Sequence, residues 1–321
     1  MYHPLPLTIA SLPVSDFGPA SALRRSLPYS ALVLSLACLV FAPTTRAVLP
    51  SPPPDGGYAG GNTAEGQNAL FNLTSGVANT AIGFQALFHN SSGGDNTATG
   101  VDALLNNTTG ARNTANGYEA LLSSMTAADN TATGFAVLAS NTTGIFNTAD
   151  GSQALFHNTT GRENTASGFA ALFSNVNGSS NTATGYKALF SNTGAENTAT
   201  GASALLNNTT GIFNTATGSE ALFNNTTGGD NVADGAGALR DNTTGGSNTA
   251  SGSEALAFNT TGNDNTASGA FALSRNTFGS SNTANGSQAL RFNTTGIANT
   301  ASGFEALANN TVGIDNTANG N

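Results

Sequence analysis

Residues 96–112 read NTATGVDALLNNTTGAR, and this stretch of 17 residues returns with variations through most of the chain. The triplet Asn-Thr-Ala, with Val232 once in place of the Thr, begins sixteen copies, and fourteen of the fifteen intervals between them are 17 residues long. The interval from Asn181 to Asn197 is 16 residues. Similarity at a fixed short period is typical of repeat proteins, in which each unit packs on its neighbours. We number the unit N-T-A-x-G-x-x-A-L-x-x-N-T-T-G-x-x from position 1 to position 17.

The residue types within the unit favour strands over helices. Each unit carries two turn signals with Gly, which leaves no room for a helix of useful length, whereas two short strands and two bends fit. The first expected strand is T-A-x-G, where side-chain alternation turns the invariant Ala of position 3 inward and positions 2 and 4 outward. The second expected strand is centred on Ala-Leu, and its Leu, present in all fifteen full units, fills the core. The orientation of the Ala at position 8 stays open.

These patterns predict an all-β fold, a parallel β-solenoid or β-roll of about fifteen 17-residue coils over residues 62–321. In the N-T-T-G segment, Asn and Gly are expected at turn positions that need a left-handed backbone. Stacked Asn side chains of successive coils are expected to bond one another in a ladder. With one strand spacing per coil, the stack would be about 70 Å long.

The N-terminal region has the pattern of an export signal, and we assign residues 1–47 to a signal peptide region. Arg24 and Arg25 precede the apolar run ALVLSLACLVFA, which is too short to span a bilayer, and small residues follow it at Ala42 and Ala47. A buried helix, a lipoprotein site at Cys38 and a twin-arginine signal are weaker alternatives. A linker rich in Pro and Gly occupies residues 48–61. The signal predicts a secreted or cell-surface protein without a transmembrane segment.

Composition restricts the chemistry that the chain can perform. Only 8% of the residues are charged, and without residues 1–47 there are 17 acidic against 6 basic residues, a net charge of −11. Nothing resembles a basic groove, so nucleic acid is not expected as a partner. The lone Cys38 provides neither a disulfide nor a thiolate metal site. No nucleophile, carboxylate pair or calcium-roll motif stands out, and we therefore expect no enzyme activity, no metal and no cofactor.

The motif N-T-A-x-G-x-x-A-L, as in NTAIGFQAL at residues 79–87, resembles the head repeats of trimeric autotransporter adhesins of the YadA-like type. The likeness extends from Asn62 to the C-terminus and implies a left-handed parallel β-roll, a homotrimer, and binding to an extracellular surface or matrix ligand. The family's unit is shorter, and neither a coiled-coil stalk nor a membrane anchor follows the repeats here. Because the sequence stops within a unit, at residues 316–321, we expect either a fragment or a rod that is secreted or held by another protein.

Aromatic residues recur at position 6, after the first Gly, and at position 10, after the Leu. Exposed aromatic residues in a column would form an oligomer seam or a ligand face, whereas buried ones would fill the corners of the core. Both interpretations remain open. The candidate seam at position 6 consists of Phe84, Tyr118, Phe135, Phe169 and Tyr186.

Threonine residues at positions 2 and 4 make T-x-T rows on the flat face expected for the first strand. Regular T-x-T arrays on a β-solenoid resemble those of ice-binding proteins, although Glu65, Asp150 and Asp234 interrupt the array here. The other interpretation is a solvated, Thr-rich surface. The candidate ice or ligand face consists of Thr97, Thr99, Thr131, Thr133, Thr182, Thr184, Thr198, Thr200, Thr215 and Thr217.

The N-T-T segments also match the N-glycosylation sequon, for example at Asn107, Asn158 and Asn242. In a eukaryotic secretory pathway the rod would be densely glycosylated. The leading prediction from the sequence is a secreted or cell-surface structural and adhesive rod that presents a repetitive face, with ice binding as the alternative.

Overall fold

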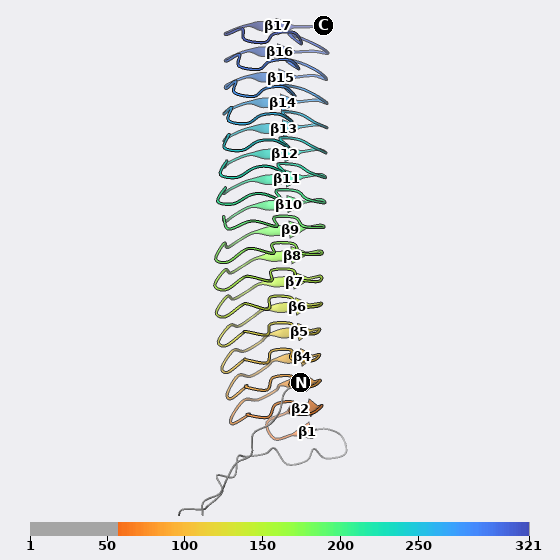
Figure 1. Ribbon diagram of the computed structural model, residues 1–321, viewed down its shortest axis with the longest axis vertical. Helices are drawn as coiled ribbons and strands as arrows, with labels where there is room; N and C mark the ends of the chain where they lie inside the picture. The colour runs from red at the N-terminus through yellow and green to blue at the C-terminus, as the bar shows by residue number, and fades with distance from the viewer. Residues whose placement is uncertain (1–56, 321) are drawn as a thin grey trace, which may run out of the picture. The chain divides into compact units, whose positions relative to one another are not determined.

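The computed structural model describes residues 57–320, and these form a stack of coils in which one short strand recurs in every coil (Figure 1). Apart from the hairpin strand β1 (Gly57–Tyr58), the strands occupy positions 2–4 of the unit, with position 1 added in β2, and residues 57–320 contain no helix. The strands are β2 (Asn62–Glu65), β3 (Thr80–Ile82), β4 (Thr97–Thr99), β5 (Thr114–Asn116), β6 (Thr131–Thr133), β7 (Thr148–Asp150), β8 (Thr165–Ser167), β9 (Thr182–Thr184), β10 (Thr198–Thr200), β11 (Thr215–Thr217), β12 (Val232–Asp234), β13 (Thr249–Ser251), β14 (Thr266–Ser268), β15 (Thr283–Asn285), β16 (Thr300–Ser302) and β17 (Thr317–Asn319).

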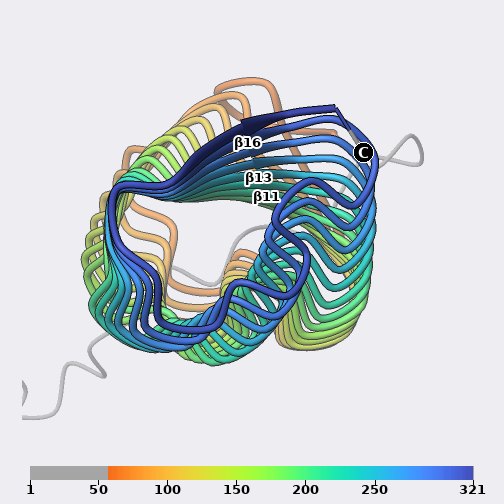
Figure 2. The ribbon, with the colours of Figure 1, turned by 90° about the horizontal axis from the view of Figure 1, so that it is seen from above.

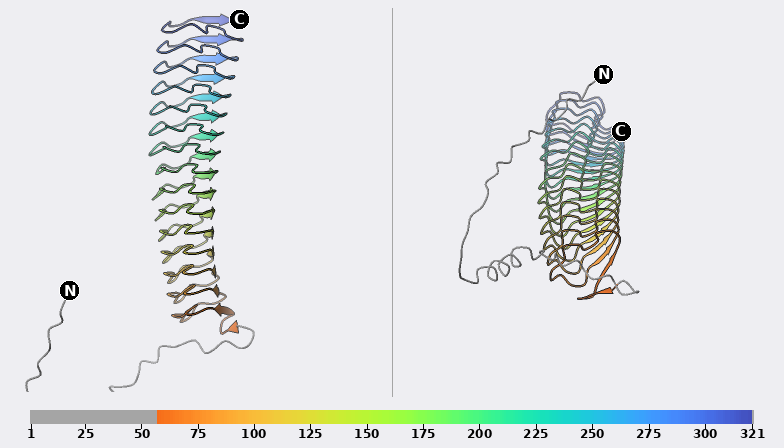
Figure 3. Two further views of the ribbon diagram at one scale, coloured as in Figure 1. Left: turned by 45° about the vertical axis from the view of Figure 1, so that its right-hand side comes forward. Right: turned by 60° about the horizontal axis from the view of Figure 1, so that its bottom comes forward.

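Strands β2 to β17 pair in parallel and in register, so the predicted parallel β-solenoid of 17-residue coils is confirmed. Ala81 of β3 lies opposite Ala98 of β4, and the same pairing of position 3 with position 3 continues along the sheet. The register survives the 16-residue coil, because Ala183 still lies opposite Ala199. Figure 3 shows that the strands follow one side of the stack and the irregular segments the other. The missing residue is therefore absorbed outside the sheet.

The second predicted strand, at Ala-Leu, does not form. Position 7 and the Leu of position 9 both have left-handed backbone conformations, as at Gln85 with φ 55° and Leu87 with φ 52°, so the chain turns there. The coils nevertheless remain hydrogen-bonded, since the Leu87 N–H donates to the Ala103 carbonyl at 3.0 Å. Viewed along the stack, the coils follow one another around a common contour (Figure 2). Each coil is thus joined to its neighbours well beyond the strand.

Three apolar columns fill the interior. The Ala of position 3 and the Leu of position 9 are buried as predicted; Ala149 is 1% exposed and Leu155 0%. The Ala of position 8, whose orientation the sequence leaves open, is buried too, as at Ala154. The core is therefore narrow and made almost entirely of two residue types.

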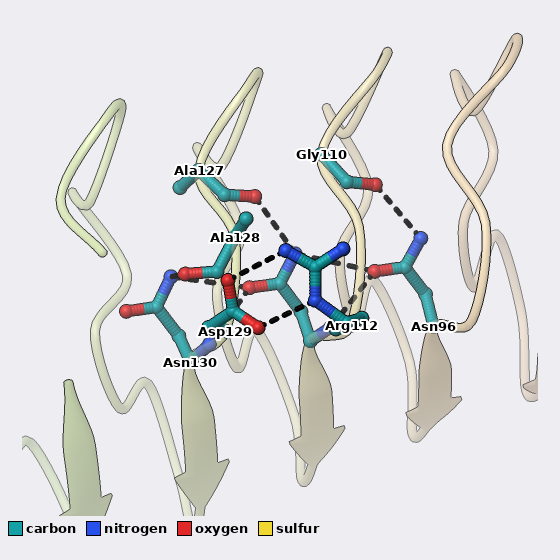
Figure 4. Close-up of polar contacts among 8 residues, drawn as sticks. Asn96, Gly110, Arg112, Ala127, Ala128, Asp129 and Asn130 are labelled. Carbon is teal, nitrogen blue, oxygen red and sulfur yellow. Dashed lines mark hydrogen bonds and ion pairs between the residues drawn. The ribbon is translucent and has the colours of Figure 1, made fainter. Parts of the chain in front are cut away.

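Two ladders of buried asparagines run beside this apolar core. At position 1, the Asn96 amide nitrogen Nδ2 donates to Asn79 Oδ1 at 3.1 Å. Figure 4 shows its second bond, to the Gly110 carbonyl at 2.8 Å. At position 12, Asn158 Nδ2 donates to Asn141 Oδ1 at 2.8 Å. The predicted ladder in the N-T-T-G segment is confirmed, and the second ladder at position 1 is an addition. Both satisfy amides that would be costly to bury alone.

The prediction that N-T-T-G needs a left-handed backbone is wrong. The left-handed residues lie at positions 5, 7, 9 and 17, whereas the Gly of position 15 has no positive φ. Position 15 instead requires Gly because space is lacking. A Cβ on Gly161 would overlap Asn158 Oδ1 in its own coil and the Gly178 carbonyl of the next coil.

A short hairpin covers the first coil. Gly57 and Tyr58 of β1 pair in antiparallel fashion with Thr63 and Asn62 of β2, and Tyr58 packs against the apolar core. This hairpin uses residues that the sequence assigns to the linker 48–61. Residues 1–56 and 321, which include the predicted signal peptide region 1–47, lie outside the described residues.

Candidate functional surfaces

The threonine face lies on the outer side of the sheet. In β9, β10 and β11 the burial alternates, with both Thr exposed and the Ala between them buried. Register places Thr182, Thr198 and Thr215 in one column and Thr184, Thr200 and Thr217 in the next. Six of the ten predicted residues thus form one uninterrupted array.

The other four predicted threonines lie in isolated rows. Thr97 and Thr131 are exposed and Thr99 and Thr133 are half-buried, and β5, which reads T-A-N, separates their strands β4 and β6. On the other side of the array, β12 ends it with Val232 and Asp234. The regular surface therefore covers three strands.

The candidate seam at position 6 is exposed to solvent, which excludes the corner-filling interpretation for this column. Tyr118 stacks on Phe135 with ring centroids 5.4 Å apart, and Phe169 stacks on Tyr186 at 5.6 Å. Relative exposures of the five residues run from 42% at Phe84 to 53% at Tyr186. From residue 202 to residue 287 the position holds only Ala or Ser. The five residues of the aromatic seam thus lie in the N-terminal half of the stack, and position 6 is aromatic again only at Phe304, which is 50% exposed.

Position 10 carries a second aromatic column that is half-buried. Phe156, Phe173 and Phe190 form a continuous stack with centroid distances of 5.4 Å and 5.0 Å, and Phe71 stacks on Phe88 at 5.3 Å. These rings cover the edge of the core without entering it. They offer less free surface than the position 6 rings.

A strip between positions 11 and 13 is hollowed at two places, above the buried ladder of position 12. The larger hollow, of about 520 Å³, is lined by Asn72, His89, Asn106, Thr108, Ser123, Met125 and Thr142. The smaller one, of about 260 Å³, is lined by Phe258, Arg275, Thr277 and Thr294. The repeat pattern does not indicate this strip, because the residues at position 11 differ from coil to coil and the Thr of position 13 belongs to the common unit.

Charged groups are sparse and mostly acidic, and the closest ion pair joins two coils at position 17. Arg112 Nε lies 2.6 Å from Asp129 Oδ1, and its Nη2 lies 2.8 Å from Oδ2 (Figure 4). This hydrogen-bonded guanidinium holds the pKa of Asp129 below its ordinary value. At position 7, burial and then the charge of Glu119 raise the pKa of Asp102. His89 and His157 are exposed, and residues 57–320 contain no group of three or more potential metal-ligating side chains.

The asparagines of the N-T-T sequons are buried. Asn107, Asn158 and Asn242 are 0% exposed, and each uses Nδ2 for two hydrogen bonds. The folded coil therefore leaves no room for a glycan at these positions.

No protein-family model, no curated protein and no solved structure matches the chain. Within residues 57–320, the search for a helix that is long and apolar enough to cross a membrane is negative. The surfaces themselves are therefore the basis for a functional proposal.

Proposed function

We propose that the chain is a structural and adhesive rod, secreted or held at a cell surface, whose repetitive faces make many weak contacts at once. The observation that carries this proposal is the exposed column of aromatic rings at position 6, built on a stack that two asparagine ladders keep in register. Exposed apolar stripes on a soluble fold are typical of interaction sites. Contacts that are repeated along one rigid body bind together more tightly than any single contact does, through avidity.

The aromatic seam supports a homotrimer in which the position 6 columns of three copies pack together. Analytical ultracentrifugation of residues 48–321 at micromolar concentration tests this assembly. A combined Tyr118→Ser, Phe135→Ser, Phe169→Ser and Tyr186→Ser variant should sediment as a monomer. The matched control is Phe146→Ser with Phe213→Ser, two rings of similar exposure at position 17, which should leave the trimer intact. A monomeric unmodified chain would contradict the seam.

Export is tested separately from assembly. A fusion of residues 1–47 to a reporter enzyme that is active only outside the cytoplasm should give activity. Replacing Leu34 and Leu36 in the apolar run by Arg should abolish that activity. Equal activity with and without the apolar run would remove the surface and secretion part of the proposal.

Ice binding is the second candidate, favoured by the array of six aligned threonines on β9 to β11. The hydroxyl and methyl groups repeat at the strand spacing of about 4.8 Å along the stack. Thermal hysteresis and ice shaping by the purified chain test it. Thr198→Tyr with Thr200→Tyr at the centre of the array should abolish both effects, whereas Thr249→Tyr on β13 should not. An absence of ice shaping by the unmodified chain rejects this candidate.

A further inference from the structure

Half of the basic residues in 57–320 gather on one strip of an otherwise acidic rod. This range contains six Arg and Lys residues but sixteen Asp and Glu residues. Three of the six, Arg240, Arg275 and Arg291, lie at position 10 or 11 of nearby coils. Together with two phenylalanines of position 11 they make an alternating column of cations and rings beside the smaller hollow. We call this column, formed by Arg240, Phe258, Arg275, Arg291 and Phe292, the Arg–Phe column.

Each guanidinium of the column lies against a ring. The Arg240 Cζ atom is 5.0 Å from the Phe258 centroid, and the Arg275 and Arg291 Cζ atoms are 5.6 Å and 5.2 Å from the Phe292 centroid. Cation–π contact of this kind holds a guanidinium in place while its N–H edge stays available. Arginines that stack in this way are prepared to bind a planar anion.

The three arginines differ in how far their charge is compensated. Arg240 Nη2 already pairs with Asp241 Oδ2 at 3.2 Å. Arg275 has no carboxylate within salt-bridge distance among the described residues, and Arg291 donates from Nη1 to Gln288 Oε1 and keeps a buried Nε without a partner. The Arg275 and Arg291 guanidiniums thus both lie against the Phe292 ring without a carboxylate partner, and Arg291 lies against the Phe271 ring as well, at 5.4 Å. Of the two, Arg275 lines the smaller hollow, and a carboxylate placed there would compensate its charge by charge-assisted hydrogen bonds.

The other lining groups indicate what carries that carboxylate. Thr277 Oγ1 and Thr294 Oγ1 each donate to a backbone carbonyl of the following coil at 3.0 Å, so toward the hollow their oxygens act as acceptors. Acceptors require a ligand that is rich in O–H donors. The exposed Phe258 ring offers an apolar face for C–H groups. Hydroxyl groups, an apolar C–H face and a carboxylate occur together in an acidic sugar.

We infer that the Arg–Phe column is a binding site for a carboxylated sugar, a hexuronate residue within an oligosaccharide. The carboxylate binds Arg275, the sugar hydroxyls donate to Thr277 and Thr294, and the ring face packs on Phe258, and these four residues line the hollow. A densely charged polyphosphate such as nucleic acid fits less well, because the surrounding rod is acidic and repels it. The inference deepens the proposed adhesive function, on which its biological meaning rests, by naming a ligand class.

Isothermal titration calorimetry of residues 48–321 with a hyaluronate hexasaccharide tests the site. We expect saturable binding and at least tenfold weaker binding for Arg275→Gln and Phe258→Ala. Arg291→Gln, which removes a charge outside the lining of the hollow, should cause a smaller loss, and Arg275→Lys, which keeps the charge but not the fork of donors, an intermediate one. The control Arg162→Gln, an exposed arginine at position 16, should bind like the unmodified chain. Circular dichroism of every variant confirms that the coils remain stacked.

Four results would overturn the inference: no binding at millimolar hexasaccharide, equal losses for Arg275→Gln and Arg162→Gln, equal binding of neutral cellohexaose, or tighter binding of a single-stranded DNA hexamer. None of these results depends on the oligomeric state or on export. Failure of the sugar site is therefore distinguishable from failure of the rod proposal, which ultracentrifugation and the export fusion measure.

Discussion

At the scale of single residues, the leucines of position 9 combine strain with burial. All fifteen have a left-handed backbone, with φ between 50° and 53°, a conformation that costs a β-carbon residue about 1–2 kcal/mol. Full burial of a Leu side chain contributes about 1.5–3 kcal/mol, which offsets that cost. Packing of the side chains therefore maintains the Leu column, although the backbone conformation of each Leu is unfavourable.

The first prediction concerns this column. Leu155→Ala should lower the free energy of unfolding by about 2–5 kcal/mol, because a fully buried side chain is lost while the strained backbone remains. Denaturant unfolding of residues 48–321 measures the change. Ser152→Ala, at the half-buried position 6 of the same coil, is the control and should change stability little. A loss below about 1 kcal/mol for Leu155→Ala would contradict the core assignment.

One coil departs from the ladder of position 12 in two linked ways. Ser124 replaces Asn and Ala127 replaces the Gly of position 15, and both are fully buried. In the preceding coil a Cβ on Gly110 would overlap Asn107 Oδ1, so the shorter Ser124 leaves the room that the Ala127 methyl occupies. The change leaves Asn107 Oδ1 and Ser124 Oγ without hydrogen-bond partners among the described residues.

The second prediction is that these two substitutions are coupled. Ser124→Asn alone should destabilise the rod by about 1–3 kcal/mol through overpacking against Ala127. Ser124→Asn with Ala127→Gly should complete the ladder and stabilise the rod by about 1 kcal/mol, since Asn107 Oδ1 regains a donor. A double-mutant cycle of unfolding free energies gives the coupling. Additive effects would disprove the shared space.

The third prediction uses opposite pKa shifts at two aspartates. The pKa of Asp102 is raised above its ordinary value of 3.8 in the fold, so the folded chain binds this proton more tightly than the unfolded chain does. The contribution of Asp102 to stability therefore falls as the pH rises from 3.8 through the raised pKa of the folded chain. Asp102→Asn should therefore stabilise the rod at pH 7, by about 0.5 kcal/mol for relief of a like-charge pair, and less at pH 3.

Asp129 provides the contrast, because its pKa is lowered by Arg112. Its contribution is present at neutral pH and is lost as the pH falls below 3.8. Asp129→Asn should thus destabilise at pH 7 and have no effect in strong acid. Thermal melts from pH 3 to pH 7 compare the two variants, and a shift of the same sign for both at pH 7 would refute the assignment.

At the scale of the repeated element, sequence patterns predicted what faces inward but not how the chain turns. The invariant Ala of position 3 and the Leu of position 9 identified the core because burial selects residue type strongly. The apolar Ala-Leu pair was predicted to be a strand because both residues were expected near the core. In the structure the chain bends there, with the Leu in a left-handed conformation that the propensity of Leu does not predict. Likewise, position 15 requires Gly because neighbouring coils approach closely there, and the distance between coils cannot be derived from the sequence of one unit.

The fourth prediction follows from the buried sequons of this element. A glycan on Nδ2 of Asn158 would remove a ladder hydrogen bond and occupy the core, so the modified coil should not stack. After secretion from yeast, the protease-resistant fraction should carry no glycan at Asn158, whereas the exposed sequons at Asn177 and Asn285 provide the matched positive controls. Mass spectrometry of both fractions decides the question. A glycan at Asn158 in the resistant fraction would contradict the buried ladder.

At the scale of the described stack, the surfaces divide along its length. Except for Phe304, the aromatic rings of position 6 occupy coils before residue 202. The threonine array lies near the middle on β9 to β11, and the Arg–Phe column lies on coils after residue 230. The threonine rows and the position 6 seam were predictable, because each recurs at one position of the unit. The hollowed strip was not, because it combines Thr and Asn residues of the common repeat with the single residues His89, Met125, Phe258 and Arg275, and only the stacking of the coils brings them together.

The asparagine ladders also give the stack a direction. Wherever asparagines of successive coils are bonded in the two ladders, Nδ2 donates to the Oδ1 of the preceding coil, so these side-chain amide dipoles point the same way, as peptide dipoles do in an α-helix. Their hydrogens face β2 and their oxygens face β17, which makes the first end relatively positive and the last relatively negative. Like poles then meet wherever two such stacks lie parallel and side by side. A parallel bundle must therefore gain enough from its contacts to outweigh a repulsion that an antiparallel pair avoids.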